Sequence, residues 1–192
     1  ADAKANPRYI AADLLSQAEH DTLACSILLT PSQDIAEKVA VEVDKQLAKL
    51  SRNEIAKKSI ESYGRIVVTE TMEEAIDLAN EIAPEHLELA VENPFDYLNK
   101  IRNAGAIFLG EYSPEPLGDY FAGPNHTLPT SGTAKFASPL SVDAFIKKSS
   151  VIYYTREALS SVKDKIIRIA ESETLTAHAN SIRVRFESDE DE

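Results

Sequence analysis

Apolar side chains recur at helical spacing through the first third of the chain. Between residues 11 and 29 they fall three or four positions apart, which predicts one long helix. Ser32, a favourable N-cap residue, precedes a second periodic run that predicts a helix to residue 50. A third helix is predicted over residues 53–63, where Gly64 would end it. The chain is therefore expected to begin with three helices.

Short apolar runs rich in β-branched residues follow from residue 65. RIVVTE, at 65–70, predicts a buried strand. HLELAV, at 86–91, predicts a second strand, and AGAIFLG, at 104–110, predicts another buried one. Because helical patterns separate these runs, we expect an α/β fold with a mostly parallel sheet and crossover helices.

Two helices are predicted between these strands. Thr71 and Glu74 form a capping-box pattern that opens the first, and Pro84 discourages it from continuing through Ala83. The second is predicted over residues 93–103. Both would serve as crossover connections in the parallel sheet.

The pattern changes between residues 112 and 133, a polar segment in which several prolines and glycines are spread. Loops of this length without regular structure are usually functional in a compact domain. The remaining segments are predicted to be a short helix at 141–150, a strand at 151–155, an amphipathic helix at 156–173 and a small helical or strand-ended appendage at 175–186. These elements predict an α/β domain at 1–140, a small C-terminal domain at 141–186 and a disordered acidic tail at 187–192.

Composition narrows the class of protein. The formal net charge of −12 argues against nonspecific nucleic-acid binding, and no apolar run approaches the roughly 20 residues of a membrane span. No secretory signal is visible at the N-terminus. The single cysteine, Cys25, excludes an internal disulfide and a thiolate cluster, which predicts a reducing, cytoplasmic location. Cys25 itself is expected to be a small side chain on a buried helix face.

Four histidines carry the candidate chemistry, and each lies near a polar partner. Gln17 and His20 are spaced i, i+3 on the first predicted helix, so both project from one face. Glu85 and His86 follow Pro84 at a helix-to-strand junction, where an acid and a base could both reach a pocket. The alternative for either pair is an ordinary solvated surface pair.

GDYFAGPNH, at 118–126, is the most informative segment. Its glycines allow the backbone to approach a ligand, while Asp119 and His126 offer carboxylate and imidazole ligation. A plain turn-rich connector is the alternative. His178, five residues after Glu173, would by itself be a solvated histidine near the end of the chain.

Four separated segments carry a family resemblance. SQAEHD, APEHLEL, NAGAIFLGEYSPEPLGDYFAGPNHTLPTSG and ETLTAHANSIR resemble the histidinol dehydrogenase family in order and spacing. The resemblance covers the whole chain apart from the acidic tail. It implies the C-terminal part of an incomplete Rossmann-like domain plus a small C-terminal appendage.

The resemblance also implies a reaction and roles for the site residues. The family oxidises L-histidinol through histidinal to L-histidine, with two molecules of NAD and one bound zinc ion. It implies a homodimer in which zinc is held by Gln17, His20, Asp119 and His178 of the partner subunit. His86 would be the general base, and Glu85 would activate the water of the second oxidation. The implied substrate contacts are Gln17, His20, His86, Asp119, His126, Glu173 and His178, the last two from the partner subunit.

The sequence departs from the family pattern at two points. It contains no G-x-G-x-x-G or other phosphate-binding loop, so no cofactor-binding residue is assigned; the family binds its nucleotide mainly in an upstream domain. Thr174 stands where the family often has glycine, a change expected to be tolerated.

Two other functions remain open. One is a zinc-binding, dimerising module without activity, and the other is a related zinc-dependent dehydrogenase that oxidises a sulfonated diol. His126 and Glu173 suit a substrate imidazole and amine, which favours histidinol as the small-molecule partner. Neither a nucleic acid nor a membrane is expected as a partner.

Overall fold

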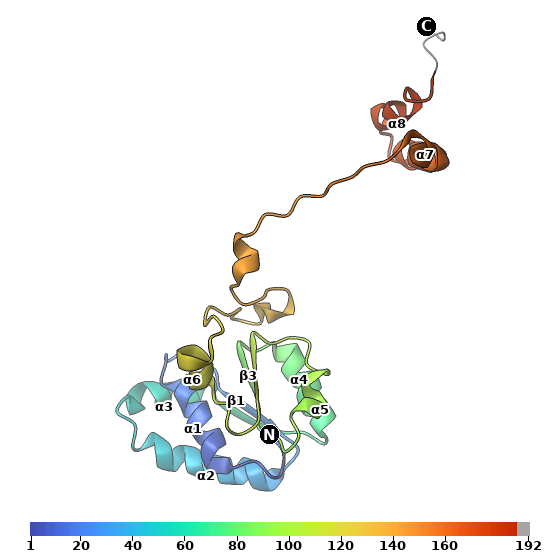
Figure 1. Ribbon diagram of the computed structural model, residues 1–192. Helices are drawn as coiled ribbons and strands as arrows, with labels where there is room; N and C mark the ends of the chain where they lie inside the picture. The colour runs from blue at the N-terminus through green and yellow to red at the C-terminus, as the bar shows by residue number, and fades with distance from the viewer. Residues whose placement is uncertain (188–192) are drawn as a thin grey trace. The chain divides into compact units, whose positions relative to one another are not determined.

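The computed structural model describes residues 1–187, and the chain divides into two compact units. The first is Ala1–Phe145, and the second begins at Ile146. Figure 1 draws the elements of each. In the described part of the chain, no helix is both long and apolar enough to cross a membrane. The proposed division into domains 1–140 and 141–186 stays a prediction.

Three helices open the first unit and lie together on one side of it (Figure 1): α1 (Pro7–Ala18), α2 (Gln33–Leu47) and α3 (Asn53–Tyr63). The Ser32 hydroxyl accepts a hydrogen bond from the Ile35 N–H at 3.3 Å, which caps α2 as predicted. The apolar faces of α1 and α2 meet around Leu15 and Val39, both almost fully buried. These helices thus form the main core of the unit.

The prediction of one helix over 11–29 is wrong. α1 ends at Ala18, and residues 27–30 form strand β1 (Ile27–Thr30). The Asp21 carboxylate accepts the Leu23 N–H at 2.8 Å, which stabilises a turn after the helix. A short apolar run fits a helix or a strand equally well, and here pairing with a distant strand decides the outcome.

The strands form two parallel pairs. β1 pairs with β2 (Arg65–Val68), and β3 (His86–Leu89) pairs with β4 (Ala106–Leu109). The α/β class with parallel strands is confirmed, although the described residues form two two-stranded sheets and not one. β2 is not buried as predicted, since Ile66 is 38% exposed and Val68 44%. Among the described strands, β2 pairs only with β1, which leaves its other edge open.

Helix α4 (Met72–Ile82) begins as the capping pattern predicts. The Thr71 hydroxyl accepts the Glu74 N–H at 3.1 Å, and the Glu74 carboxylate accepts the Glu70 N–H at 2.7 Å. The helix ends at Ala83, whose φ of 52° turns the chain before Pro84. β3 then begins with His86.

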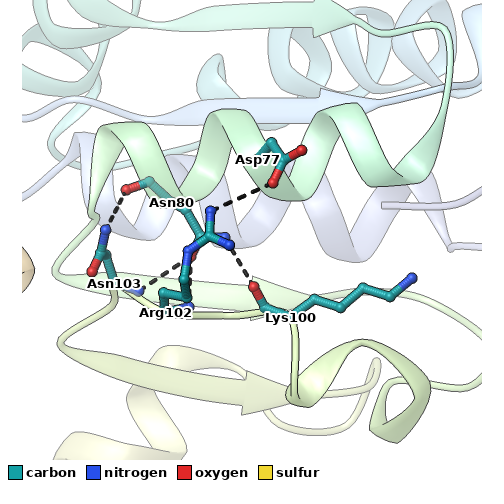
Figure 2. Close-up of polar contacts among 5 residues, drawn as sticks. All are labelled: Asp77, Asn80, Lys100, Arg102 and Asn103. Carbon is teal, nitrogen blue, oxygen red and sulfur yellow. Dashed lines mark hydrogen bonds and ion pairs between the residues drawn. The ribbon is translucent and has the colours of Figure 1, made fainter.

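The predicted helix over 93–103 is only α5 (Phe95–Leu98). Figure 2 shows the reason: the side chain of Asn80, a buried residue, forms hydrogen bonds with the residues that follow α5. Its amide donates to the Lys100 carbonyl at 2.9 Å, and its Oδ1 accepts the Arg102 and Asn103 N–H groups at 2.6 and 3.1 Å. Asp77 forms an ion pair with Arg102 at 3.6 Å. These side-chain bonds replace helical ones and fix the loop that enters β4.

The segment 112–133, predicted to lack regular structure, contains α6 (Glu115–Leu117) and a π-helical turn, η1 (Gly118–Ala122). Pro116 suits the first turn of a helix, where its missing N–H has no intrahelical partner to lose. Two 3₁₀ turns follow, η2 (Thr133–Lys135) and η3 (Val142–Phe145). The helix predicted at 141–150 is thus reduced to η3.

The second unit is a pair of packed helices, α7 (Arg156–Ser172) and α8 (Thr176–Arg183). The Thr155 hydroxyl caps α7 by accepting the Ala158 N–H at 3.2 Å. The predicted strand at 151–155 is wrong: these described residues are exposed and pair with no described strand. Apart from Glu187, the predicted acidic tail lies outside the described residues.

Candidate metal and acid–base site

A cavity of about 580 Å³ lies within the first unit, lined by β1 and β3 together with α1 and α4. Most of its lining is apolar. Polar side chains gather where α1, β3 and α6 contribute to the wall: Asp13, Ser16, Gln17, Glu85, His86, Glu88 and Glu115. Catalytic and ligand sites commonly combine an apolar wall with a few convergent polar groups of this kind.

Three potential metal ligands meet at this polar end. One ligand atom each from His86, Glu115 and Asp119 lies within 4.8 Å of the other two. His86 is the first residue of β3, and Glu115 is the first residue of α6. Asp119 follows Glu115 by four residues, so the short helical turns place both carboxylates on one face. The result is an imidazole opposite two carboxylates.

His86 is held by packing and leaves one nitrogen free. Its Nε2 is buried and has no hydrogen-bond partner among the described residues. Its ring centroid lies 6.0 Å from that of Phe108 on β4. A Cβ at Gly118 would lie 2.6 Å from Phe108 Cε1, so only glycine allows this approach of η1 to the ring. Gly118 thereby supports the packing that orients His86.

Burial and charge repulsion govern the acids of the cavity. Burial, followed by a hydrogen bond with Asp119, raises the pKa of Glu115 to about 7. Burial, followed by the charge of Asp13, raises the pKa of Glu88 to about 8. The pKa of Asp13 is also raised, again mainly by burial. Crowded, partly buried carboxylates of this kind favour either a bound proton or a bound cation.

Four predicted site residues of the first unit lie in the cluster or on the cavity wall. His86 and Asp119 belong to the ligand cluster, while Gln17 and Glu85 line the same cavity. His20 lies beyond the end of α1 and is exposed, and its carbonyl accepts a bond from Arg52 at 3.4 Å. The prediction that Gln17 and His20 share a helix is therefore wrong, because the helix ends between them.

The other predicted residues lie outside the cluster. His126 is exposed in the segment after Gly123, where φ is 99°. Glu173 and His178 belong to the second unit, in which both are exposed.

Sequence reasoning did not select Asp13, Glu88 or Glu115. A signal was present, since Asp13 precedes Gln17 and Glu115 precedes Asp119 by four residues each. That spacing places a carboxylate on the same helical face as a predicted ligand. On a chain with this many acidic residues, the spacing alone does not separate a site residue from a solvated one.

Fold and cavity together define an α/β protein with an imidazole and carboxylate site at the end of a parallel strand. Histidine nitrogen and carboxylate oxygen are ligands that zinc accepts in proteins. The His86 Nε2, which no group in residues 1–187 hydrogen-bonds, lies beside two carboxylates and is therefore compatible with a divalent metal.

The family follows from comparison with known proteins. The family model described as histidinol dehydrogenase matches residues 1–186, so the chain belongs to the histidinol dehydrogenase family. The histidinol dehydrogenase of Caldanaerobacter subterraneus subsp. tengcongensis is 63% identical over 189 residues, which are 98% of this chain and 44% of that protein. The enzyme of Clostridium acetobutylicum is 60% identical over 185 residues, 96% of this chain and 43% of that protein.

A solved structure supports the same fold. The crystal structure of histidinol dehydrogenase from Elizabethkingia anophelis matches with a TM-score of 0.87 at 43% identity, over 96% of this chain and 42% of that chain. The chain thus spans less than half the length of the relatives it matches.

Proposed function

We propose that this chain forms the metal- and substrate-binding part of a histidinol dehydrogenase. The proposed reaction oxidises L-histidinol through L-histidinal to L-histidine, with two NAD molecules as hydride acceptors. The observation that carries the proposal is the cluster of His86, Glu115 and Asp119 in a chain of this family. The single cysteine supports a reducing compartment such as the cytoplasm.

For the metal, the proposed ligands are Gln17, His20, Asp119 and His178 of the partner subunit. Support comes from Asp119 in the cluster and from Gln17 on the cavity wall. Zinc bound there would orient the amine and imidazole nitrogen of the substrate. Hydride transfer belongs to the nicotinamide, for which no binding residue of this chain is proposed.

His86 is the proposed general base. Its Nε2 is buried and has no hydrogen-bond partner in the described part of the chain, so it can accept the alcohol proton while the hydride leaves carbon for NAD. Glu85, the adjacent residue on the cavity wall, would take a proton from the water that adds to the aldehyde. His126, with Glu173 of the partner subunit, would contact the substrate.

Two variants separate the ligand role from the base role. His20→Ala should lower zinc affinity by at least about tenfold, as expected for a lost ligand. His86→Ala should abolish turnover in a complete enzyme while zinc content stays close to that of the parent. Loss of zinc from the His86 variant, with zinc retained in the His20 variant, would instead assign the metal to the cluster of His86, Glu115 and Asp119.

The proposed homodimer has its own test. Because His178 would come from the partner subunit, zinc binding should accompany dimer formation. Solution mass measured together with zinc content checks this. A monomer carrying stoichiometric zinc would show that the partner supplies no ligand.

A second candidate is a metal-binding module that dimerises without catalysing. It is favoured by the lack of a phosphate-binding glycine loop among the residues of this chain. Purified chain mixed with zinc, histidinol and NAD distinguishes the two: reduced nicotinamide would appear only if the chain is an enzyme. For the sulfonated-diol alternative, failure of imidazole-bearing amines to inhibit a complete enzyme would contradict histidinol as substrate.

A further inference from the structure

Beside the cluster of His86, Glu115 and Asp119, the cavity wall contains a second pair of acids, Asp13 and Glu88, with no role in the proposed reaction. Glu88 lies on β3 two residues after His86, so the two side chains leave the strand on the same face. Asp13 lies on α1, four residues before Gln17. Both acids line the cavity. Glu88 is thus the next residue after the proposed base on one face of β3, and Asp13 is one helical turn from the proposed ligand Gln17.

One direct hydrogen bond links this pair to the cluster. The Glu88 Oε1 accepts the N–H of Glu115 at 2.9 Å. On α1, Asp13 lies close enough to Glu88 to raise its pKa, and Ser16 lies close enough to Glu115 to lower its pKa. The Glu115 N–H is at the start of α6, where the helix itself offers no acceptor. Glu88 therefore fixes the backbone of Glu115 by a hydrogen bond. Side chains of α1 lie next to both Glu88 and Glu115.

Placing the Asp13 and Glu88 carboxyl groups next to each other lowers the stability of the fold unless another interaction offsets it. Two partly buried carboxyl groups in contact lose hydration and repel each other when charged. Apolar side chains at positions 13 and 88 would fill the same space without this cost. Packing alone therefore gives no reason for acids here, whereas an acceptor for the Glu115 N–H does.

We propose that Asp13 and Glu88 are positioning residues, a carboxyl pair that fixes the start of α6 and so holds Glu115 and Asp119 opposite His86. Neither acid needs to touch the metal. The expected effect on metal affinity rests on the proposed function. The expected effect on the conformational stability of residues 115–119 rests on the fold alone.

The first test measures, in metal-free protein, how rigidly the backbone of residues 115–119 is held. Amide hydrogen exchange over residues 115–119 should become at least about tenfold faster in Glu88→Ala, which removes the acceptor. In Glu88→Gln it should stay close to the parent, because the carboxamide accepts the Glu115 N–H and also donates to Asp13. Val43→Ala on α2, a buried core change outside the cavity, controls for general destabilisation. Equal exchange in Glu88→Ala and the parent would overturn the proposal.

The second test measures metal affinity with Co²⁺, whose visible spectrum reports its ligands. Glu88→Ala should bind Co²⁺ at least about tenfold more weakly, as outer-sphere partners of metal ligands do. Its spectrum at saturation should match the parent, while Glu88→Gln should match the parent in both properties. A changed spectrum would make Glu88 a ligand, and equally weak binding by Glu88→Gln would contradict positioning. If the parent itself binds no Co²⁺, the proposed metal site fails, and hydrogen exchange still decides the role of Glu88.

Discussion

At the scale of single residues, the site depends on acids that sequence patterns do not distinguish from surface charge. His86 and Asp119 were predicted because each lies in a segment with other chemical signals. Glu88 became a site residue only through contacts made across the fold, with Asp13 and with the Glu115 N–H, and Glu115 only through its place beside His86. Their roles depend on burial, and burial of an acidic side chain is a property of tertiary structure.

The raised pKa of Glu88 predicts a pH-dependent stability. Its folded value of about 8 exceeds the ordinary 4.5, so between these values the folded state holds a proton that the unfolded chain releases. The free energy of unfolding therefore falls as pH rises through this window. In metal-free protein, Glu88→Gln should be more stable than the parent by about 1–3 kcal/mol at pH 8.5. The difference should shrink toward pH 5. Urea denaturation at both pH values checks this, and a difference independent of pH would contradict it.

Thr174 predicts a stabilising substitution. The Leu175 N–H bonds to the Ala170 carbonyl at 2.8 Å and the Thr174 N–H to the Glu171 carbonyl at 2.9 Å, the pattern of a Schellman C-cap. Thr174 has the left-handed φ of 62° that such a cap requires, an unfavourable conformation for a β-branched residue.

Thr174→Gly should therefore stabilise the helix pair by about 1 kcal/mol. Slower amide exchange at the end of α7 would report the gain. Thr174→Ala should give a smaller gain, since alanine lacks the branch but keeps a Cβ. No gain from glycine would show that the cap is not strained.

At the scale of elements, prediction succeeded where the sequence contains its own start signals. Ser32, Thr71 and Thr155 each cap the helix predicted to follow. It failed where distant partners decide: residues 27–30 became a strand because β2 pairs with them, and residues 151–155 have no such partner among the described strands. A local pattern contains no information about which strand is available to pair.

The Asn80 network predicts a second element-scale effect. Asn80→Ala removes three bonds to the loop before β4 and leaves buried backbone groups without partners, so it should destabilise the first unit by at least about 2 kcal/mol. Asn80→Asp should cost less at low pH, where the protonated acid keeps the acceptor for Arg102 and Asn103 and can still donate to Lys100. Chemical denaturation of the three proteins checks the order. Equal stability of the alanine variant and the parent would contradict it.

Gly118 couples η1 to His86 through Phe108. Gly118→Ala should displace the Phe108 ring, destabilise the first unit by about 1–3 kcal/mol and weaken metal binding. Adding Phe108→Leu, which shortens the side chain at the clash, should restore part of the loss, so the double variant should be more stable than the sum of the single changes predicts. Strict additivity would show that this contact does not transmit the effect.

At the scale of the whole molecule, the resemblance of four separated motifs predicted the family, which the family model and relatives confirm. The α/β class also followed from the alternation of strands and helices. Local sequence patterns could not predict which ligands come together, because the proposed ligands come from both units and from a partner subunit. Only the first unit is needed to bring His86, Glu115 and Asp119 together.

Zinc-dependent binding of L-histidinol tests the central claim most directly. Calorimetric titration of the chain with L-histidinol should give binding when zinc is loaded and none after the metal is removed. Asp119→Ala, which removes a residue of both the cluster and the proposed ligand set, should lose zinc and histidinol binding together. Histidinol binding that persists without zinc, or zinc binding unchanged in Asp119→Ala, would contradict a metal-dependent histidinol site at this cavity.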